Sequence, residues 1–325
     1  FRSSGSKPED VLNPIDVGTG VPTYPVGQII FDINGEYANA NMQDEGTAIY
    51  EMFKTDVTRY SVIEKEDFKV MKVNFYHDLI EGFSLIKAGL EDETSDYVRS
   101  FCSYEMIEPD PSNRSAMTRY DRHIAAYKCC LYKAGFPVPQ NFTVRFRGNA
   151  DLNRHANNID PSRGISLEDA AEWFNYIWDY PDIETLTTSS GRRWLDDELR
   201  ALIVMLTRKS RPGGNANLSG FQKLRPIRQL HTSTVDQPFA DEILELLRKG
   251  KIVIIDLSQG SPEIQRLYSE RICQKLFYNS MDRFIKTEPN NFIQFYFEEA
   301  HNLFPKKDDK DLSQIYNRIA KEGAK

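Results

Sequence analysis

The stretch "KIVIIDLS", residues 251–258, decides the fold of this chain. It is a near-continuous apolar run that reaches Asp256, and such runs are typical of strands that helices bury on both faces of a parallel sheet. Segments with helical periodicity flank it, "DQPFADEILELLRKGK" at 236–251 and "SPEIQRLYSERICQKLFYNSMDRF" at 261–284. Helix, strand and helix in succession predict a parallel sheet with right-handed crossovers.

Two further stretches repeat the pattern of a buried strand that ends in acids. "GQIIFDINGEY" at 27–37 has an apolar run that ends in Asp32, followed by an Asn-Gly turn signal. "FIQFYFEEAHNLFP" at 292–305 has five apolar residues among its first six, which predicts a fully buried strand, and Glu298 and Glu299 follow side by side. Burial in a strand accounts for these aromatic side chains, so we interpret them as core and not as a surface for stacking bases.

The long helix predicted at 261–284 has one apolar face. This face is formed by Ile264, Leu267, Tyr268, Ile272, Leu276, Phe277, Met281 and Phe284. Residues 57–63 and 69–76 are predicted to form two more strands, and a last helix is expected at about 311–322. All of these elements fit one sheet with helices packed on it.

The middle of the chain has a different pattern and is predicted to be helical. Amphipathic segments lie at 116–136, 166–178 and 192–206, and the second opens with a capping box in which Asp169 follows Ser166 by three residues. We therefore expect an α/β fold with two parts. Residues 1–76 and 223–325 form a mostly parallel sheet flanked by helices, and residues 77–222 form an inserted helical subdomain.

Composition restricts the class of protein. The chain has 325 residues, 40% of them hydrophobic and 27% charged, which is typical of a globular protein. No apolar run approaches the roughly 18 residues of a membrane span, and no signal-peptide pattern opens the sequence. Four cysteines without metal-site spacing favour reduced thiols in a cytoplasmic protein. A net charge of −7 argues against a protein that coats nucleic acid with its whole surface, but it permits a local basic channel.

The acids at the strand ends suggest a chemistry. Ligands of parallel sheets bind at the carboxyl ends of the strands, where Asp32, Glu36, Asp256, Glu298 and Glu299 are expected. Any one of them alone is more simply a helix cap or a solvated loop acid. The adjacent pair is different, because one carboxylate can hold a hydrated Mg²⁺ and the next can polarise an attacking water. This combination is typical of nucleotide hydrolysis.

Four segments together resemble the HerA family of hexameric DNA-translocating ATPases, relatives of FtsK and of the conjugative transfer ATPases. They are "IIFDINGEYAN", "KIVIIDLS", "FYFEEAHNLFP" and "RIAKEGAK", in this order along the chain. The resemblance covers about residues 20–76 and 223–325 and implies a RecA-like ATPase core that uses ATP and Mg²⁺. The helical insertion is similar in placement and hardly in sequence.

The resemblance implies roles for the residues of the third segment. Glu298 would be the Walker B acid that holds Mg²⁺ through water, and Glu299 would activate the hydrolytic water. His301 and Asn302 would follow in the loop that senses the γ-phosphate.

Three residues from the other segments are assigned to the same nucleotide. Asp32 and Glu36 would line the pocket from the neighbouring strand. Arg318 would lie close to where one subunit reaches the nucleotide of the next. In "KEGAK", Ala324 stands where the family has an arginine that can serve as a finger in trans.

The phosphate-binding loop of such ATPases is absent from this sequence. No G-x-x-x-x-G-K-[S/T] pattern occurs, and "SSGSK" at 3–7 lacks the required spacing and a preceding strand, so we interpret it as plain loop. The resemblance places that loop before Phe1, and the chain is therefore expected to be part of a longer protein. Residues 1–325 alone are expected to bind ATP poorly and not to hydrolyse it.

Partners are also implied by the resemblance. It implies a homohexameric ring with double-stranded DNA in the central pore, together with a nuclease or another effector in DNA end processing or anti-phage defence. Basic clusters in the helical insertion are weak candidates for the DNA contacts, and the simpler interpretation of each is a solvated surface. The candidates are Arg145, Arg147, Arg208, Lys209 and Arg211, with Arg192 and Arg193 as a further pair.

Two function classes stay open from the sequence. One is an ATP-driven DNA motor, favoured by the Glu298–Glu299 pair. The other is a catalytically weakened scaffold with an ATPase fold that only assembles a partner effector, favoured by Ala324 and the missing phosphate loop. An unrelated α/β hydrolase is a weaker third, since no G-x-S-x-G pattern is present.

Overall fold

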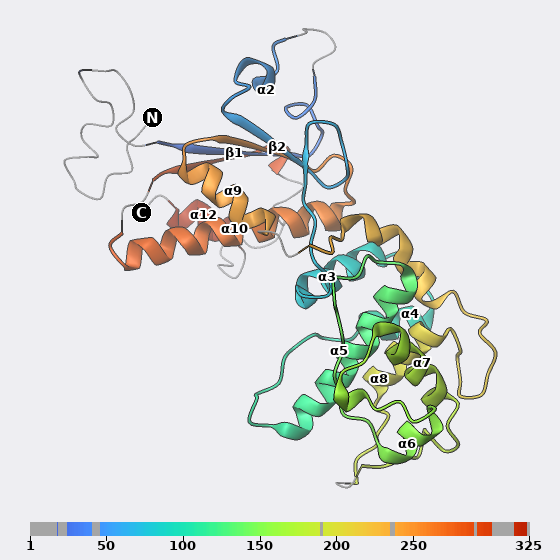
Figure 1. Cartoon of the computed structure of the whole chain (residues 1–325). Helices are drawn as coiled ribbons and strands as arrows, with labels where there is room; N and C mark the ends of the chain where they lie inside the picture. The colour runs from blue at the N-terminus through green and yellow to red at the C-terminus, as the bar shows by residue number, and fades with distance from the viewer. Residues whose placement is uncertain are drawn as a thin grey trace. The chain divides into compact units, whose positions relative to one another are not determined.

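The computed structural model divides the chain into two compact units, and each is described by itself. One unit comprises Phe1–Lys72 with Asp236–Lys325, and the other comprises Val73–Val235 (Figure 1). We call them the sheet unit and the helical unit. The structure describes residues 18, 25–40, 46–188, 191–234, 238–288, 291–300 and 315–323.

The sheet unit contains five strands that are all parallel. Their order is β3-β2-β4-β1-β5. The strands are β1 (Gly27–Asp32), β2 (Val57–Ser61), β3 (Lys69–Val70), β4 (Ile252–Asp256) and β5 (Ile293–Phe297). The predicted central strand β4 lies between β1 and β2, and Val253, Ile254 and Ile255 are fully buried. A parallel sheet flanked by helices confirms the predicted fold class.

Helices cover the sheet on both sides. Helices α9 (Phe239–Arg248), α10 (Pro262–Ile285) and α12 (Ile315–Glu322) pack on one face (Figure 1). The short helix α2 (Ile49–Met52) lies over the other face, where Ile30 and Ile254 form a small core with Ile49 and Phe68. The sheet is therefore a central layer, as the apolar pattern of β4 requires.

The long helix α10 follows the predicted face only in part. Ser261 caps it by accepting a hydrogen bond from the Ile264 backbone amide at 3.4 Å, and Pro262 occupies the first turn. Tyr268, Ile272, Leu276 and Phe277 of the predicted apolar face are buried, but Phe284, which continues this face, is 63% exposed. A helix of 24 residues is about 36 Å long, roughly twice the length of a five-residue strand, so its end extends past the sheet.

Strand β5 also differs from the prediction. It was expected to be fully buried, but Gln294 and Tyr296 are exposed while Ile293, Phe295 and Phe297 are half-buried. The reason is its position, because β5 is an edge strand that pairs with β1 alone within the described residues. One face still packs: the Phe297 ring stacks on Phe31 at a centroid distance of 5.0 Å.

The helical unit is built around α5 (Arg114–Ala134), which packs against α7 and α8. Trp173, Phe174 and Trp178 of α7 are fully buried. Ser166 is the predicted N-cap of α7, since its Oγ accepts from the Asp169 amide at 3.0 Å, and the Asp169 carboxylate accepts from the Ser166 hydroxyl at 2.8 Å and not from the Ser166 backbone. The unit's elements are α3 (Leu79–Gly89), α4 (Asp96–Cys102), α5, α6 (Ala150–His155), η1 (Pro161–Arg163), α7 (Leu167–Trp178), α8 (Asp197–Thr207) and η2 (Gly220–Leu230).

Two element boundaries were predicted wrongly for local reasons. The strand expected at 69–76 ends at Val70, because Val73 instead bridges to His231 in the helical unit. The helix expected from residue 192 starts at Asp197, because Arg193 pairs with Thr187 and Asp196 caps the helix.

The structure also shows the surroundings of the cysteines and the character of the helices. All four cysteines are free, and Cys129, Cys130 and Cys273 are buried packing residues. Among the helices of the described ranges, none combines the length and apolar character that crossing a membrane requires.

Candidate functional site at the carboxyl edge of the sheet

Four polar residues form a row across the carboxyl ends of the strands. Asp32 of β1 is the register partner of Asp256 of β4, which in turn partners Ser61 of β2. Glu298 directly follows β5, and its amide donates to the Phe31 carbonyl of β1 at 3.1 Å. Register partners on neighbouring strands project from the same face of a sheet, so Asp32, Asp256 and Ser61 share one face. The Glu298 carboxyl lies against the Asp32 carboxyl. We call these four residues the acid row.

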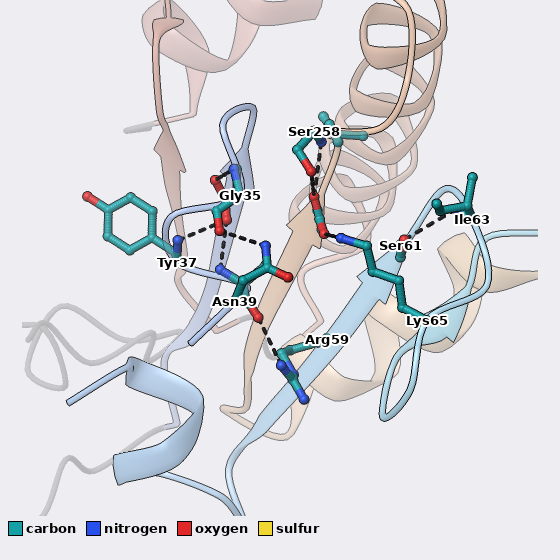
Figure 2. Close-up of polar contacts among 12 residues, drawn as sticks. Gly35, Tyr37, Asn39, Arg59, Ser61, Ile63, Lys65 and Ser258 are labelled. Carbon is teal, nitrogen blue, oxygen red and sulfur yellow. Dashed lines mark hydrogen bonds and ion pairs between the residues drawn. The ribbon is translucent and has the colours of Figure 1, made fainter. Parts of the chain in front are cut away.

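Asp32 is fully buried, and its carboxylate is enclosed by backbone amides. Oδ1 accepts from Gly35 at 2.6 Å and Glu36 at 3.1 Å, and Oδ2 accepts from Tyr37 at 2.9 Å and Ala38 at 2.7 Å (Figure 2). Hydrogen bonds from several amides offset the cost of burying a carboxylate. Asp32 therefore organises the loop 33–38, and both of its oxygens are engaged in doing so.

Gly35 allows this loop to close. Its φ of +83° is in the left-handed region, and a Cβ there would lie 2.8 Å from Asn39 Nδ2 and 3.2 Å from Ser258 Oγ. Only glycine adopts this conformation at such a close approach without strain. The loop after β1 is thereby held against the loop after β4.

Asp256 is also buried, and both of its carboxylate oxygens have partners within the fold. Its Oδ1 accepts from the Ser258 amide at 3.0 Å and from Ser258 Oγ at 2.6 Å, and its Oδ2 forms an ion pair with Lys65 Nζ (Figure 2). Ser258 could have been predicted from the local Asp-x-Ser pattern, which is typical of side-chain-stabilised turns. Lys65 gave no such signal, because it lies far away in sequence, in the loop after β2.

An arginine fixes the outer side of the loop. Arg59 of β2 donates to the Ala38 carbonyl at 2.9 Å (Figure 2). Its guanidinium also lies 3.7 Å from the ring centroid of Tyr50 and 4.2 Å from that of Phe68. Cation–π contacts with these two rings hold the guanidinium in place, so its hydrogen bond to the loop has a fixed direction. Arg59 therefore anchors the end of the loop that Asp32 organises.

Glu298 is an acid of this row whose pKa is raised well above its ordinary value. Burial, a hydrogen bond to the Asp32 carboxyl and the negative charges of Asp32 and Glu36 together raise its pKa from 4.5 to about 7. The Asn34 amide donates to Oε2 at 3.3 Å and opposes this shift. A carboxyl group crowded by two other acids would release its proton if a cation were bound beside it.

This shift predicts a pH-dependent stability. The folded-state pKa of Glu298 lies above the unfolded value, so the folded state binds more protons and the free energy of unfolding should fall as pH rises from about 4.5 to about 7. Glu298→Gln should remove this contribution. In metal-free buffer, the variant should therefore melt at the parent's temperature near pH 4.5 and above it at pH 8. Equal melting temperatures at both pH values would contradict the assigned environment.

Glu299 differs from Glu298 in both backbone and exposure. Its φ is +47°, in the left-handed region, and its side chain is exposed. Left-handed backbone is uncommon outside glycine, asparagine and aspartate, and where it occurs in other residues it points to a local constraint. The two adjacent glutamates therefore differ in their surroundings: Glu298 is half-buried beside Asp32, and Glu299 is exposed.

The other residues assigned from the resemblance have varied positions. Glu36 is exposed in the loop 33–38. Arg318 of α12 lies over the rings of Phe277 and Tyr278, at 4.6 and 5.5 Å, in the second half of α10. These ring contacts hold α12 on α10, and Arg318 also pairs with Glu322 of its own helix at 3.4 Å. His301, Asn302 and Ala324 lie outside the described residues.

The basic candidates divide into two groups. Arg208 ends α8 with a φ of +62° and donates to the Leu218 carbonyl at 2.7 Å, and Lys209 pairs with Asp179 at 2.6 Å. Both side chains therefore form contacts that stabilise the helical unit. Arg145, Arg147 and Arg211 are exposed.

The acid row suits a cation only if other ligands complete the site. Among the described residues, no group of three or more His, Cys, Asp or Glu side chains is arranged to hold a metal ion. Mg²⁺ needs few protein ligands, because it keeps several waters and takes phosphate oxygens of its substrate. Glu298 therefore fits a magnesium nucleotide better than it fits a structural metal ion.

Comparison with known proteins adds no family assignment. No protein-family model matches the chain, and no curated protein matches it.

Proposed function

We propose that this chain is the core of an ATP-hydrolysing DNA translocase of the HerA type, which acts in the cytoplasm as a homohexameric ring with a nuclease or another effector. The observation that carries the proposal is Glu298. It is a carboxyl group at the carboxyl edge of an all-parallel sheet, its pKa is raised to about 7 by burial and by neighbouring acids, and a second carboxylate, Glu299, follows it directly.

In this proposal the two glutamates have different roles. Glu298 would hold Mg²⁺ through water, and the ion, when bound, would neutralise negative charge on the nucleotide phosphates. Glu299, which is exposed on a turn, would accept a proton from the attacking water. Asp32 and Arg59 would act indirectly, because they fix the loop 33–38 beside Glu298.

The proposal requires a phosphate-binding loop from outside residues 1–325. The sequence contains no such pattern, and the amides of Gly35 to Ala38, which could bind an anion, are already used by Asp32. Hydrolysis is therefore expected of the full-length protein and not of residues 1–325 alone.

A scaffold with a weakened ATPase core is the second candidate. It is favoured by the engagement of Asp32, Asp256 and Arg318 in contacts within the fold. The two candidates differ in turnover, since only the motor hydrolyses ATP.

The test is ATP turnover by the full-length protein with and without double-stranded DNA, together with its mass in solution. The motor predicts a DNA-stimulated rate on the order of 1 per second or more, in a particle of six subunits. A hexamer without turnover would favour the scaffold. A stable monomer at micromolar concentration, with and without ATP, would contradict both.

A further inference from the structure

A short extended segment of the helical unit presents arginines on one side only. Over residues 143–147 the side chains alternate: Val144 and Phe146 are buried, whereas Arg145 and Arg147 are exposed. Val144 bridges to Ile165 in antiparallel fashion, and the Phe146 ring packs 5.2 Å from that of Phe174. The buried residues therefore fix the backbone, and both arginines project from the opposite side.

A third arginine lies on the neighbouring segment. Arg163 ends η1, and its side chain is 85% exposed. Arg145 Nε donates to the carbonyl of Ser162, the preceding residue, at 2.8 Å. This bond holds the Arg145 guanidinium beside the segment that carries Arg163. We call Arg145, Arg147 and Arg163 the arginine triplet.

The triplet has an excess of positive charge. Arg163 pairs with Asp160 at 3.4 Å. Hydrogen bonds from the Ser162 hydroxyl and amide lower the pKa of Asp160, so its charge persists at neutral pH. Asp160 is the carboxylate that pairs with a member of the triplet, and it pairs with Arg163 alone, so three guanidinium groups leave a positive surface on a chain whose net charge is −7.

We propose that the arginine triplet binds the phosphate backbone of nucleic acid, independently of base sequence. Guanidinium groups pair with phosphate in a bidentate geometry. Arg145 and Arg147 are two residues apart on an extended segment, about 6.6 Å, which is close to the rise of two nucleotides of one strand along the helix axis, about 3.4 Å each. The choice of DNA as the nucleic acid rests on the proposed function.

A nucleic acid fits this surface better than an acidic protein does. Protein interfaces are built around buried aromatic and aliphatic anchors. Here Val144, Phe146 and Pro161 face the interior, so the exposed side offers charge and no apolar anchor. Arg208 and Lys209 are left out of the site because both are half-buried, whereas all three residues of the triplet are exposed.

The test compares two triple variants of the full-length protein. Arg145→Gln/Arg147→Gln/Arg163→Gln removes the triplet. Arg99→Gln/Arg114→Gln/Arg225→Gln removes the same charge from exposed arginines elsewhere on the helical unit. Binding of two fluorescent 30-base-pair duplexes of unrelated sequence is measured by anisotropy between 50 and 300 mM salt, and melting curves establish that each variant folds.

The triplet variant is expected to bind both duplexes roughly tenfold or more weakly at 100 mM salt, and its slope of log affinity against log salt should be smaller by about 3. The control variant should keep the parent's slope. Equal slopes for the two variants would overturn the proposal, as would a parent that binds an acidic polypeptide but no duplex.

ATP turnover without DNA separates this proposal from the proposed function. If the parent hydrolyses ATP but the triplet variant binds DNA like the control, the arginine site is wrong and the motor stands. If no variant hydrolyses ATP but DNA binding depends on the triplet, the site stands and the motor is wrong.

Discussion

Glu299→Gln in the full-length protein is expected to keep binding ATP and Mg²⁺ and to lose ATP turnover by roughly a hundredfold or more. Glutamine has a similar shape but cannot accept the proton of the attacking water, and the loss of a general base costs this much. The side chain is exposed on a turn, so the substitution should leave the melting temperature nearly unchanged. The measurements are nucleotide affinity, DNA-stimulated turnover and a melting curve on the same preparation.

Glu298→Gln is the matched control, because it makes the same replacement of a carboxylate by an amide at the neighbouring residue. Its defect should lie in the metal site, so added Mg²⁺ should restore part of the turnover, whereas Glu299→Gln should not respond. The scaffold predicts neither pattern, since there is little turnover to lose. If Glu299→Gln hydrolyses ATP like the parent, strand β5 does not carry a Walker B pair and the proposed function fails.

The sequence predicted a helix or strand correctly where a local pattern of residues was enough to determine it. The apolar run of β4 predicted a buried central strand, and Ser166 and Asp169 predicted the start of α7. Prediction failed where burial depends on which other element lies nearby. Phe284 continues the apolar face of α10, but that part of the helix extends beyond the sheet. Tyr296 is exposed because β5 is an edge strand, and the order of strands cannot be derived from the composition of any one of them.

The candidate site was predictable in its location and not in its contacts. Parallel topology brings Asp32, Asp256 and Glu298 to one edge, as expected from strand ends. The sequence does not reveal which acid is available for a ligand. Four amides of its own loop engage Asp32, and Lys65, from a distant loop, engages Asp256. Glu298 is left as the acid whose charge the surroundings least stabilise, and this follows only from the three-dimensional arrangement.

Asp32→Ala should be the most destabilising single change at this edge of the sheet. The carboxylate is fully buried and accepts four backbone hydrogen bonds, from Gly35, Glu36, Tyr37 and Ala38. Hydrogen bonds to a charged group contribute about 1.5–3 kcal/mol each, and they are not additive. We therefore expect the free energy of unfolding to fall by about 3 kcal/mol or more, measured by urea denaturation at pH 7.

Glu36→Ala is the matched control, because Glu36 is an exposed acid in the same loop and its loss should change the free energy of unfolding by no more than about 0.5 kcal/mol. Asp32→Asn adds a second test. The asparagine amide nitrogen would face backbone amides, so this near-isosteric change should also be strongly destabilising. Both Asp32 variants should also lower the pKa of Glu298, since they remove the charge of Asp32 that helps to raise it. If Asp32→Ala is as stable as Glu36→Ala, the loop 33–38 does not depend on the Asp32 carboxylate, and the explanation of why Glu298 alone remains available for a cation is wrong.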